Sequence, residues 1–137
     1  MRLFLLSCAL LFVVATLPAS AAPPAAPSNV VLVAPYVSTL KLSWQDNSNN
    51  ETGFEISYRV GTSGTFGVFG TVAANSTTLD LNGASPMLTY QFQVRASLIP
   101  GPEYSAYAGP ATATTPGFIN PPALLAPLMA GTPPPAQ

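Results

Sequence analysis

Apolar and polar residues alternate one by one along three stretches of the chain. The stretches are residues 39–44, 54–60 and 90–96. Their apolar positions are Leu40, Leu42 and Trp44, then Phe54, Ile56, Tyr58 and Val60, then Tyr90, Phe92, Val94 and Ala96. Because successive side chains of a β-strand point to opposite faces, a period of two predicts strands with one buried and one solvated face.

We expect weaker strands at four further segments. They are Asn29–Ala34, Phe66–Val72, Thr77–Leu81 and Tyr107–Thr114. Residues that favour turns separate the segments, such as Asp46–Asn50, Asn82–Gly83 and Pro100–Pro102. No segment has helical spacing. The pattern predicts an all-β fold, a seven-stranded immunoglobulin-like antiparallel β-sandwich.

The first residues predict export. Arg2 supplies a positive charge, Leu3–Leu17 is almost wholly apolar, and Pro18–Ala22 offers small residues where a signal peptidase cuts. A membrane-spanning helix needs about 20 apolar residues, and Pro18 interrupts the apolar run before it reaches that length. We expect a cleaved signal peptide, and therefore a secreted or extracytoplasmic protein, extracellular or periplasmic, without stable membrane insertion of the mature chain. Leu5–Cys8 resembles a lipoprotein box, but most of the apolar run follows that cysteine, which disfavours lipidation.

Proline divides the mature chain. It clusters after the signal peptide and again near the C-terminus, and it locks φ and donates no backbone hydrogen bond. We therefore expect a signal peptide at residues 1–22, a Pro/Ala-rich linker at 23–27, one folded domain at 28–116, and a Pro-rich, apolar, flexible tail at 117–137.

Charge and residue inventory disfavour whole classes of activity. The chain has 137 residues, of which 4 are Lys or Arg and 5 are Asp or Glu, with a net charge of −1 and no histidine. Such a balance gives no basic surface for nucleic acid. Cys8 lies in the signal peptide, so the mature chain has neither His nor Cys for a catalytic triad, a zinc site or a thiol centre. We expect no enzyme, no cofactor and no metal.

Carboxylates are the remaining chemical groups. Asp46, Glu51 and Glu55 flank one loop, but a small sandwich offers no cleft in which two would face each other. Residues 46–51 also alternate oxygen-bearing side chains, as a calcium loop does. Glu51 stands where an EF-hand loop needs Gly, however, and the twelfth-position Glu is missing. We interpret this loop as a plain turn in which Asp and Asn bond their own backbone.

From Pro27 to Pro116 the chain resembles a fibronectin type III domain. The resemblance runs through Ala26–Val30, Leu40–Trp44, Gly53–Arg59, Thr89–Ala96 and Thr112–Pro116, and Trp44–Phe54 looks like modules of secreted bacterial proteins.

Two structural roles follow from that resemblance. Trp44 matches the core tryptophan of the second strand, and Tyr90 matches the tyrosine whose hydroxyl bonds to nearby backbone in a tyrosine corner. The family usually has leucine six residues before this tyrosine, where this chain has Ala84; Leu81 and Leu88 are the substitutes.

Outward positions on the third and sixth strands carry Glu55, Arg59 and Arg95. Because those strands are neighbours in the family, a cross-strand charge pair is expected, worth less than about 1 kcal/mol because we expect both partners to be solvated.

Recognition is the activity left open. Residues 98–107 place apolar and aromatic side chains on and beside a turn, and loops at a sandwich end often bind partners. The candidate recognition loop comprises Ile99, Glu103, Tyr104 and Tyr107. The competing interpretation is that the two tyrosines pack on a neighbouring strand.

The function expected is a secreted non-enzymatic binding or spacer module. Its contacts would be with an unknown extracellular protein, a polysaccharide or the cell envelope. The alternative is an accessory, carbohydrate-binding module from an extracellular polysaccharide hydrolase lineage, although few aromatic residues are free to form a sugar-binding face.

Overall fold

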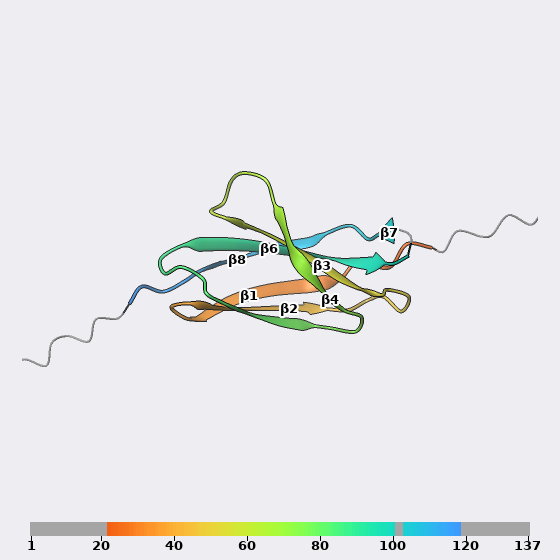
Figure 1. Ribbon diagram of the computed structural model, residues 1–137, viewed down its shortest axis with the longest axis horizontal. Coiled ribbons are helices and arrows are strands. Elements are labelled where there is room, and N and C mark those ends of the chain that lie inside the picture. The colour runs from red at the N-terminus through yellow and green to blue at the C-terminus, as the bar shows by residue number, and fades with distance from the viewer. Residues whose placement is uncertain (1–21, 101–102, 119–137) are drawn as a thin grey trace, which may run out of the picture.

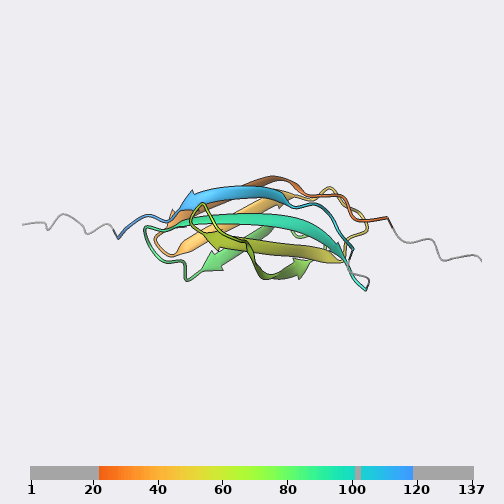
Figure 2. The ribbon, with the colours of Figure 1, turned by 90° about the horizontal axis from the view of Figure 1, so that it is seen from above.

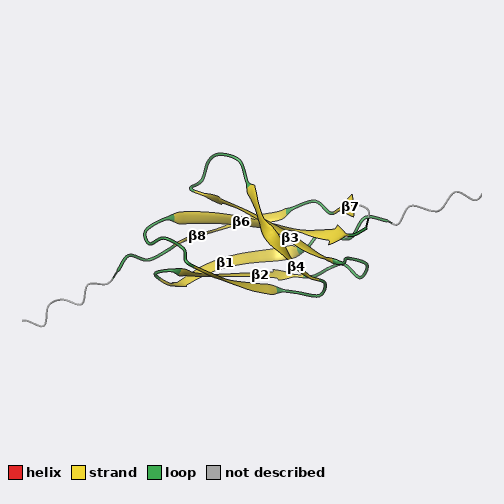
Figure 3. Ribbon diagram, in the orientation of Figure 1, coloured by secondary structure: helices red, strands yellow, loops and turns green. Residues whose placement is uncertain are grey.

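Two antiparallel sheets face each other in a computed structural model that describes residues 22–100 and 103–118 (Figures 1 and 3). The strands are β1 (Ser28–Tyr36), β2 (Thr39–Gln45), β3 (Gly53–Val60), β4 (Gly67–Ala73), β5 (Thr78–Asn82), β6 (Thr89–Leu98), β7 (Glu103–Tyr104) and β8 (Ala108–Thr114). One sheet has the order β1-β2-β5. The other has the order β4-β3-β6, with β7 and β8 both paired to β6 (Figure 2). The predicted all-β sandwich is confirmed.

The additional strand, β7, lies before the last predicted strand, within the predicted recognition loop, while the segment predicted at Tyr107–Thr114 forms β8. β7 pairs with the end of β6 through Ser97 and Tyr104, and β8 pairs with the rest of it. Between them Ser105 replaces a backbone partner with its side chain: its Oγ accepts from the Ala96 N–H at 2.9 Å. Gly109 then has φ +102°, where a Cβ would lie 3.0 Å from the Phe92 carbonyl oxygen. These two residues bend the chain and interrupt the ladder.

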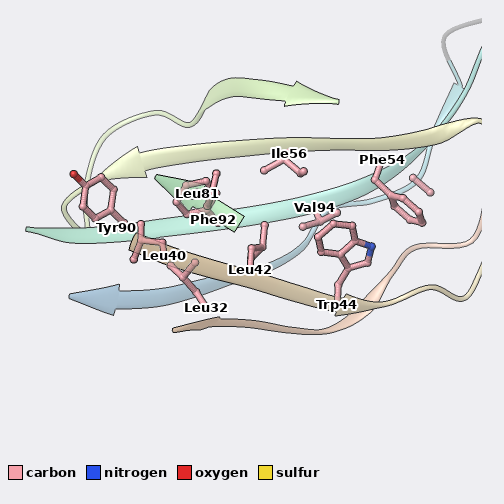
Figure 4. Packing of buried hydrophobic residues seen from close by; sticks show 11 residues of the cluster. Leu32, Leu40, Leu42, Trp44, Phe54, Ile56, Leu81, Tyr90, Phe92 and Val94 are labelled. Atoms are coloured by element: carbon pink, nitrogen blue, oxygen red, sulfur yellow. The ribbon is translucent and has the colours of Figure 1, made fainter. Parts of the chain in front are cut away.

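Alternation produces the core. The apolar positions of β2 and β6 are buried while their neighbours are more accessible. In Figure 4 the buried side chains of the two sheets point toward one another. The Trp44 ring lies 5.6 Å from that of Phe54, and the Phe92 ring lies 5.6 Å from that of Tyr58. On β3, Glu55 and Ser57 of the outward face are buried as well.

The chain enters the sandwich at one end and leaves it at the other (Figure 1). We call the end where β6 begins the Tyr90 end, and the opposite one the Trp44 end. The described chain enters at the Trp44 end, where the Asn47 and Asn50 side-chain amides donate to the carbonyls of Ala26 and Ala22 at 2.9 Å each. Residues 23–27, expected to form a linker, thus lie against the loop after β2. The chain leaves at the Tyr90 end, after β8 (Figure 1).

The signal peptide expected at residues 1–22 lies almost wholly outside the described residues, and so does most of the tail expected at 117–137. Among residues 22–100 and 103–118 there is no helix of the length and apolar character that crossing a membrane requires.

Candidate recognition surface

The two tyrosines of the predicted recognition loop lie against one arginine. Tyr104 is in β7 and Tyr107 just precedes β8, while Arg95 projects from the adjoining strand β6. The Arg95 guanidinium carbon is 3.7 Å from the Tyr104 ring centre and 4.6 Å from the Tyr107 ring centre. A guanidinium within about 6 Å of an aromatic face is attracted by the ring quadrupole. Arg95 therefore fixes both rings on the outer face of the sheet.

A carboxylate holds that arginine in place. The Glu55 Oε1 atom on β3 accepts a hydrogen bond from Arg95 Nε at 3.0 Å and forms an ion pair with Arg95 Nη2 at 2.8 Å. The two residues are register partners on adjacent strands. The same oxygen accepts a hydrogen bond of 2.5 Å from the Tyr107 hydroxyl, whose oxygen accepts from Ser57 Oγ at 3.0 Å. We call Glu55, Ser57, Arg95, Tyr104 and Tyr107 the tyrosine–arginine cluster.

The expected cross-strand pair is therefore present, but the expectation that both of its partners are solvated was wrong. Glu55 is 7% exposed and Arg95 is partly buried. The physical reason is the covering of this face by Tyr104 and Tyr107, which the alternation along β3 does not reveal. Arg59 stays outside the cluster: its Nε donates to Gln91 at 2.8 Å and its guanidinium lies over Phe66.

Tyr107 shows the effect of these surroundings on its ionisation. Its pKa is raised above the ordinary 10.0, first by burial and then by the hydrogen bond to Glu55, while the Ser57 hydrogen bond opposes the change. Burial and a neighbouring carboxylate both disfavour a phenolate. The hydroxyl thus stays protonated and continues to donate to Glu55 throughout the neutral range.

The other two predicted recognition residues lie beside the same turn. Ile99 is 57% exposed, and its backbone N–H donates to Thr52 Oγ1 at 2.9 Å. Glu103 lies in β7 opposite Leu98 and is partly buried. Residues 101–102, at the tip of the turn, lie outside the described residues. Ile99 is therefore an exposed apolar side chain at the Trp44 end, next to the strand that carries Tyr104.

The acidic loop after β2 forms a turn. Asp46 Oδ1 accepts from the Ser48 N–H at 2.9 Å, which is an Asx turn. Glu51 Oε1 accepts from the Asn75 N–H at 3.2 Å and so ties this loop to the turn before β5. In the part of the chain that the structure describes, no three Asp, Glu, His or Cys residues gather into a set that could hold a metal ion.

Trp44 and Tyr90 occupy structural positions. Trp44 is buried among the core residues, and the Tyr90 hydroxyl accepts from the Ser85 N–H at 2.9 Å, which is the geometry of a tyrosine corner. Of the two leucines considered as substitutes near Ala84, Leu81 is buried in the core and Leu88 is 39% exposed. Leu81 therefore supplies the packing, and Leu88 does not.

Sequence reasoning missed the connection between Arg95 and the tyrosines. It placed Arg95 beside Glu55 from strand order, but treated Tyr104 and Tyr107 separately. The useful signal was the spacing of the two tyrosines around Ser105. In a straight strand, residues i and i+3 point to opposite faces. Both can therefore face one neighbouring strand only when the segment between them bends. Ser57, which completes the hydrogen-bond chain, carried no distinguishing signal.

Comparisons with known proteins agree on the architecture. The family description "Fibronectin type III domain" matches residues 25–107. A Fn3-like protein from Clostridium thermocellum is 18% identical and aligns over 70% of this chain and 97% of its own, with a TM-score of 0.57. The FN3 domain of human collagen XX is 23% identical, covers 74% of this chain and 100% of its own, and has a TM-score of 0.53.

A third solved structure, the FN5 domain of Drosophila Lar, is 20% identical over 69% of this chain and 98% of its own, with a TM-score of 0.53. At these identities the likeness concerns the fold alone. No curated protein matches the chain.

Proposed function

Because the chain belongs to the fibronectin type III family, whose domains commonly serve as binding or spacer modules, we propose that it is an exported, non-enzymatic binding module that contacts its partner through the tyrosine–arginine cluster and Ile99. The partner is an extracellular protein or a polysaccharide. The observation that carries the proposal is the fixing of two partly exposed tyrosine rings by one arginine.

Rigidity is what makes this surface suited to binding. A side chain that becomes ordered on binding costs roughly 0.5–1.5 kcal/mol of affinity. Tyr104 and Tyr107 are already held by Arg95, and Tyr107 is also held by Glu55. A partner would therefore contact aromatic rings that are already ordered, so that little conformational entropy is lost on binding. Binding loops rich in tyrosine have the same advantage.

Charge supports contact with a neutral partner. The charges of Arg95 and Glu55 compensate each other through an ion pair and a hydrogen bond. Ile99 adds exposed apolar area at the Trp44 end. Aromatic edges, hydroxyl groups and an apolar side chain suit a protein surface or a sugar polymer better than an ion. A polysaccharide partner would favour the accessory-module interpretation.

A retention assay tests the surface. Residues 22–137 are mixed with insoluble polysaccharides, peptidoglycan and secreted proteins of the source organism, and bound material is measured after sedimentation or pull-down. We expect retention that the double variant Tyr104→Ala/Tyr107→Ala loses. Tyr36→Ala is the matched control, because Tyr36 is a 72% exposed tyrosine on β1, away from the cluster.

The outcomes separate the alternatives. Equal retention of the double variant and the parent would place binding elsewhere on the domain. Retention of neither would contradict a binding role for this surface. Circular dichroism on every variant shows whether lost retention reflects lost folding.

A spacer is the second candidate function, and the positions of the chain ends favour it. The described chain enters at the Trp44 end and leaves at the Tyr90 end, so the domain separates its flanking segments by its full length (Figure 1). Export itself is tested by the mass of the protein recovered outside the cytoplasm, which should lack about the first 22 residues.

A further inference from the structure

An apolar groove enters the core at the Tyr90 end. Its volume is about 260 Å³. It is lined by Leu40, Tyr58, Val60, Phe69, Leu81, Asn82, Gly83, Ala84, Tyr90 and Phe92. Figure 4 shows Leu40, Leu81, Tyr90 and Phe92 gathered at this end of the sandwich. No lining residue is charged. For scale, a 150 Å³ cavity with apolar walls binds benzene.

The groove exists because two edges of the sandwich meet without pairing. β4 ends one sheet and β5 ends the other, so no hydrogen bonds join them. Phe69 on β4 reaches toward Tyr58 and Phe92 but stays 51% exposed. Ala84, on the opposite wall, has only a methyl group with which to fill the space. Among the aromatic side chains of the groove, Phe69 is thus the most exposed and Tyr58 is partly exposed, while Tyr90 and Phe92 are buried.

The chain leaves the domain directly beside this groove. Thr115 is 1% exposed, and its Oγ1 donates to the Ser85 carbonyl at 2.6 Å and accepts from the Leu88 N–H at 3.1 Å. Ser85 follows Ala84 of the groove wall and donates its own N–H to Tyr90. Gly117 packs so closely on Met87 that a Cβ there would lie 3.3 Å from that side chain. The exit point is therefore fixed next to the groove.

The segment after Phe118 is uncharged and mostly apolar. Residues 119–130 read Ile-Asn-Pro-Pro-Ala-Leu-Leu-Ala-Pro-Leu-Met-Ala. In a polyproline-type conformation, with three residues per turn, Pro122, Leu125 and Leu128 share one face. Leu125 is seven residues beyond Phe118, a reach of up to about 25 Å when extended. The two leucines can therefore return to a groove wall that adjoins the exit point.

We propose that residues 119–130 dock in this groove of their own domain, with Leu125 and Leu128 against Tyr58, Phe69 and Ala84. The match is one of chemistry: an uncharged groove lined by aromatic and aliphatic side chains receives an uncharged segment of leucine and proline. Docking in the same chain needs no partner and places the segment at high effective concentration. The tail then completes the core at the Tyr90 end, far from the tyrosine–arginine cluster.

Nuclear magnetic resonance on methyl-labelled residues 22–137 tests the proposal. This piece keeps every described residue. The same fold makes up nearly all of two solved chains, 97% and 100% of their length, so it forms without a further domain. We expect nuclear Overhauser contacts from the Leu125 and Leu128 methyl groups to the rings of Tyr58 and Phe69. The absence of such contacts would overturn the proposal.

Thermal unfolding of matched variants gives an independent readout. Leu125→Ser/Leu128→Ser should lower Tm by about 4–8 °C, the effect of roughly 1 kcal/mol in a domain of this size. Leu124→Ser/Met129→Ser removes as much apolar surface from the other faces and should change Tm by less. Equal effects of the two double variants would contradict the face-specific fit.

A groove variant links the two halves of the proposal. Ala84→Leu fills the space that the tail leucines would occupy, so the Overhauser contacts should disappear and Leu125→Ser/Leu128→Ser should no longer lower Tm in that background. If this variant does not fold, the tail variants decide the matter alone. Contacts that persist between differently labelled molecules, together with a dimeric mass by light scattering, would overturn docking in cis in favour of a second copy.

Discussion

The two ends of β6 meet different neighbours. Near the Trp44 end, Arg95 is surrounded by groups of its own domain: Glu55 neutralises it and two tyrosine rings cover it. Near the Tyr90 end, Tyr90 and Phe92 line a groove that no side chain of the described residues fills. Around Arg95 the charges are paired within the domain, whereas the groove keeps an aromatic side chain, Phe69, 51% exposed.

This difference reflects the physical nature of the contacts. Polar contacts are directional and costly to leave unmade when buried, so a buried glutamate requires partners within the fold. Apolar walls only lose burial when exposed, at about 25 cal/mol per Å². A domain can therefore tolerate an open apolar groove, but not an unpaired Glu55. Substitutions at the two ends should differ in cost accordingly.

The largest difference in stability between the two ends is expected when one aromatic side chain is truncated at each end. Trp44→Ala removes a buried ring at the Trp44 end and should lower the free energy of unfolding by roughly 3–5 kcal/mol. Phe69→Ala removes a half-exposed ring from the groove and should cost about 1–2 kcal/mol, because less of its surface is withdrawn from water. Urea unfolding of both variants measures the difference. Similar losses would mean that the groove is packed as tightly as the core.

The next largest loss of stability is expected from removing the negative charge of Glu55. Glu55→Gln leaves Arg95 partly buried without its counter-charge and should lower the free energy of unfolding by about 2 kcal/mol. Asp80→Asn is the matched control, since Asp80 is an exposed acid in register with Lys41, and should cost less than about 0.5 kcal/mol. Equal urea midpoints for the two variants would show that Glu55 behaves as a surface carboxylate.

A smaller effect is expected from one hydroxyl at the Tyr90 end. Tyr90→Phe removes the acceptor of the Ser85 N–H and should lower the free energy of unfolding by about 1 kcal/mol. Tyr36→Phe removes a solvated hydroxyl and should leave the midpoint unchanged. No loss in Tyr90→Phe would mean that the corner contributes nothing to stability.

The alternation of apolar and polar residues was enough to predict the sandwich, but not the contacts that form between side chains on its surface. The apolar positions of β2, β3 and β6 are spaced two apart, and each of those strands formed where the period placed it. The short strand β7 and the break before β8 could not be predicted, because they depend on Ser105 bonding to Ala96 and on the backbone at Gly109.

The candidate site was predictable only in pieces, because its contacts join distant residues. Tyr107 and Glu55 are 52 positions apart, and nothing in either neighbourhood indicates that they meet. The burial of Glu55 follows from that contact. The groove depends on the volumes of Ala84 and Phe69 on opposite walls, which become relevant only after the strands have been placed.

The pH dependence of stability gives the finest test of the polar end. The pKa of Tyr107 is raised above 10.0 by burial and by Glu55, so in the alkaline range the unfolded chain loses this proton before the folded one does. The stabilisation is fully present below about pH 10 and is lost as the pH rises through the folded pKa, because the phenolate can no longer donate to Glu55. Urea midpoints of the parent should therefore fall more steeply above pH 10 than those of Tyr107→Phe. The two proteins differ only in the Tyr107 hydroxyl, so the difference between their curves reports on that group. Parallel curves would show that the Tyr107 hydroxyl is not held by Glu55 in solution, and the rigid surface on which the binding proposal depends would lose one of its two supports.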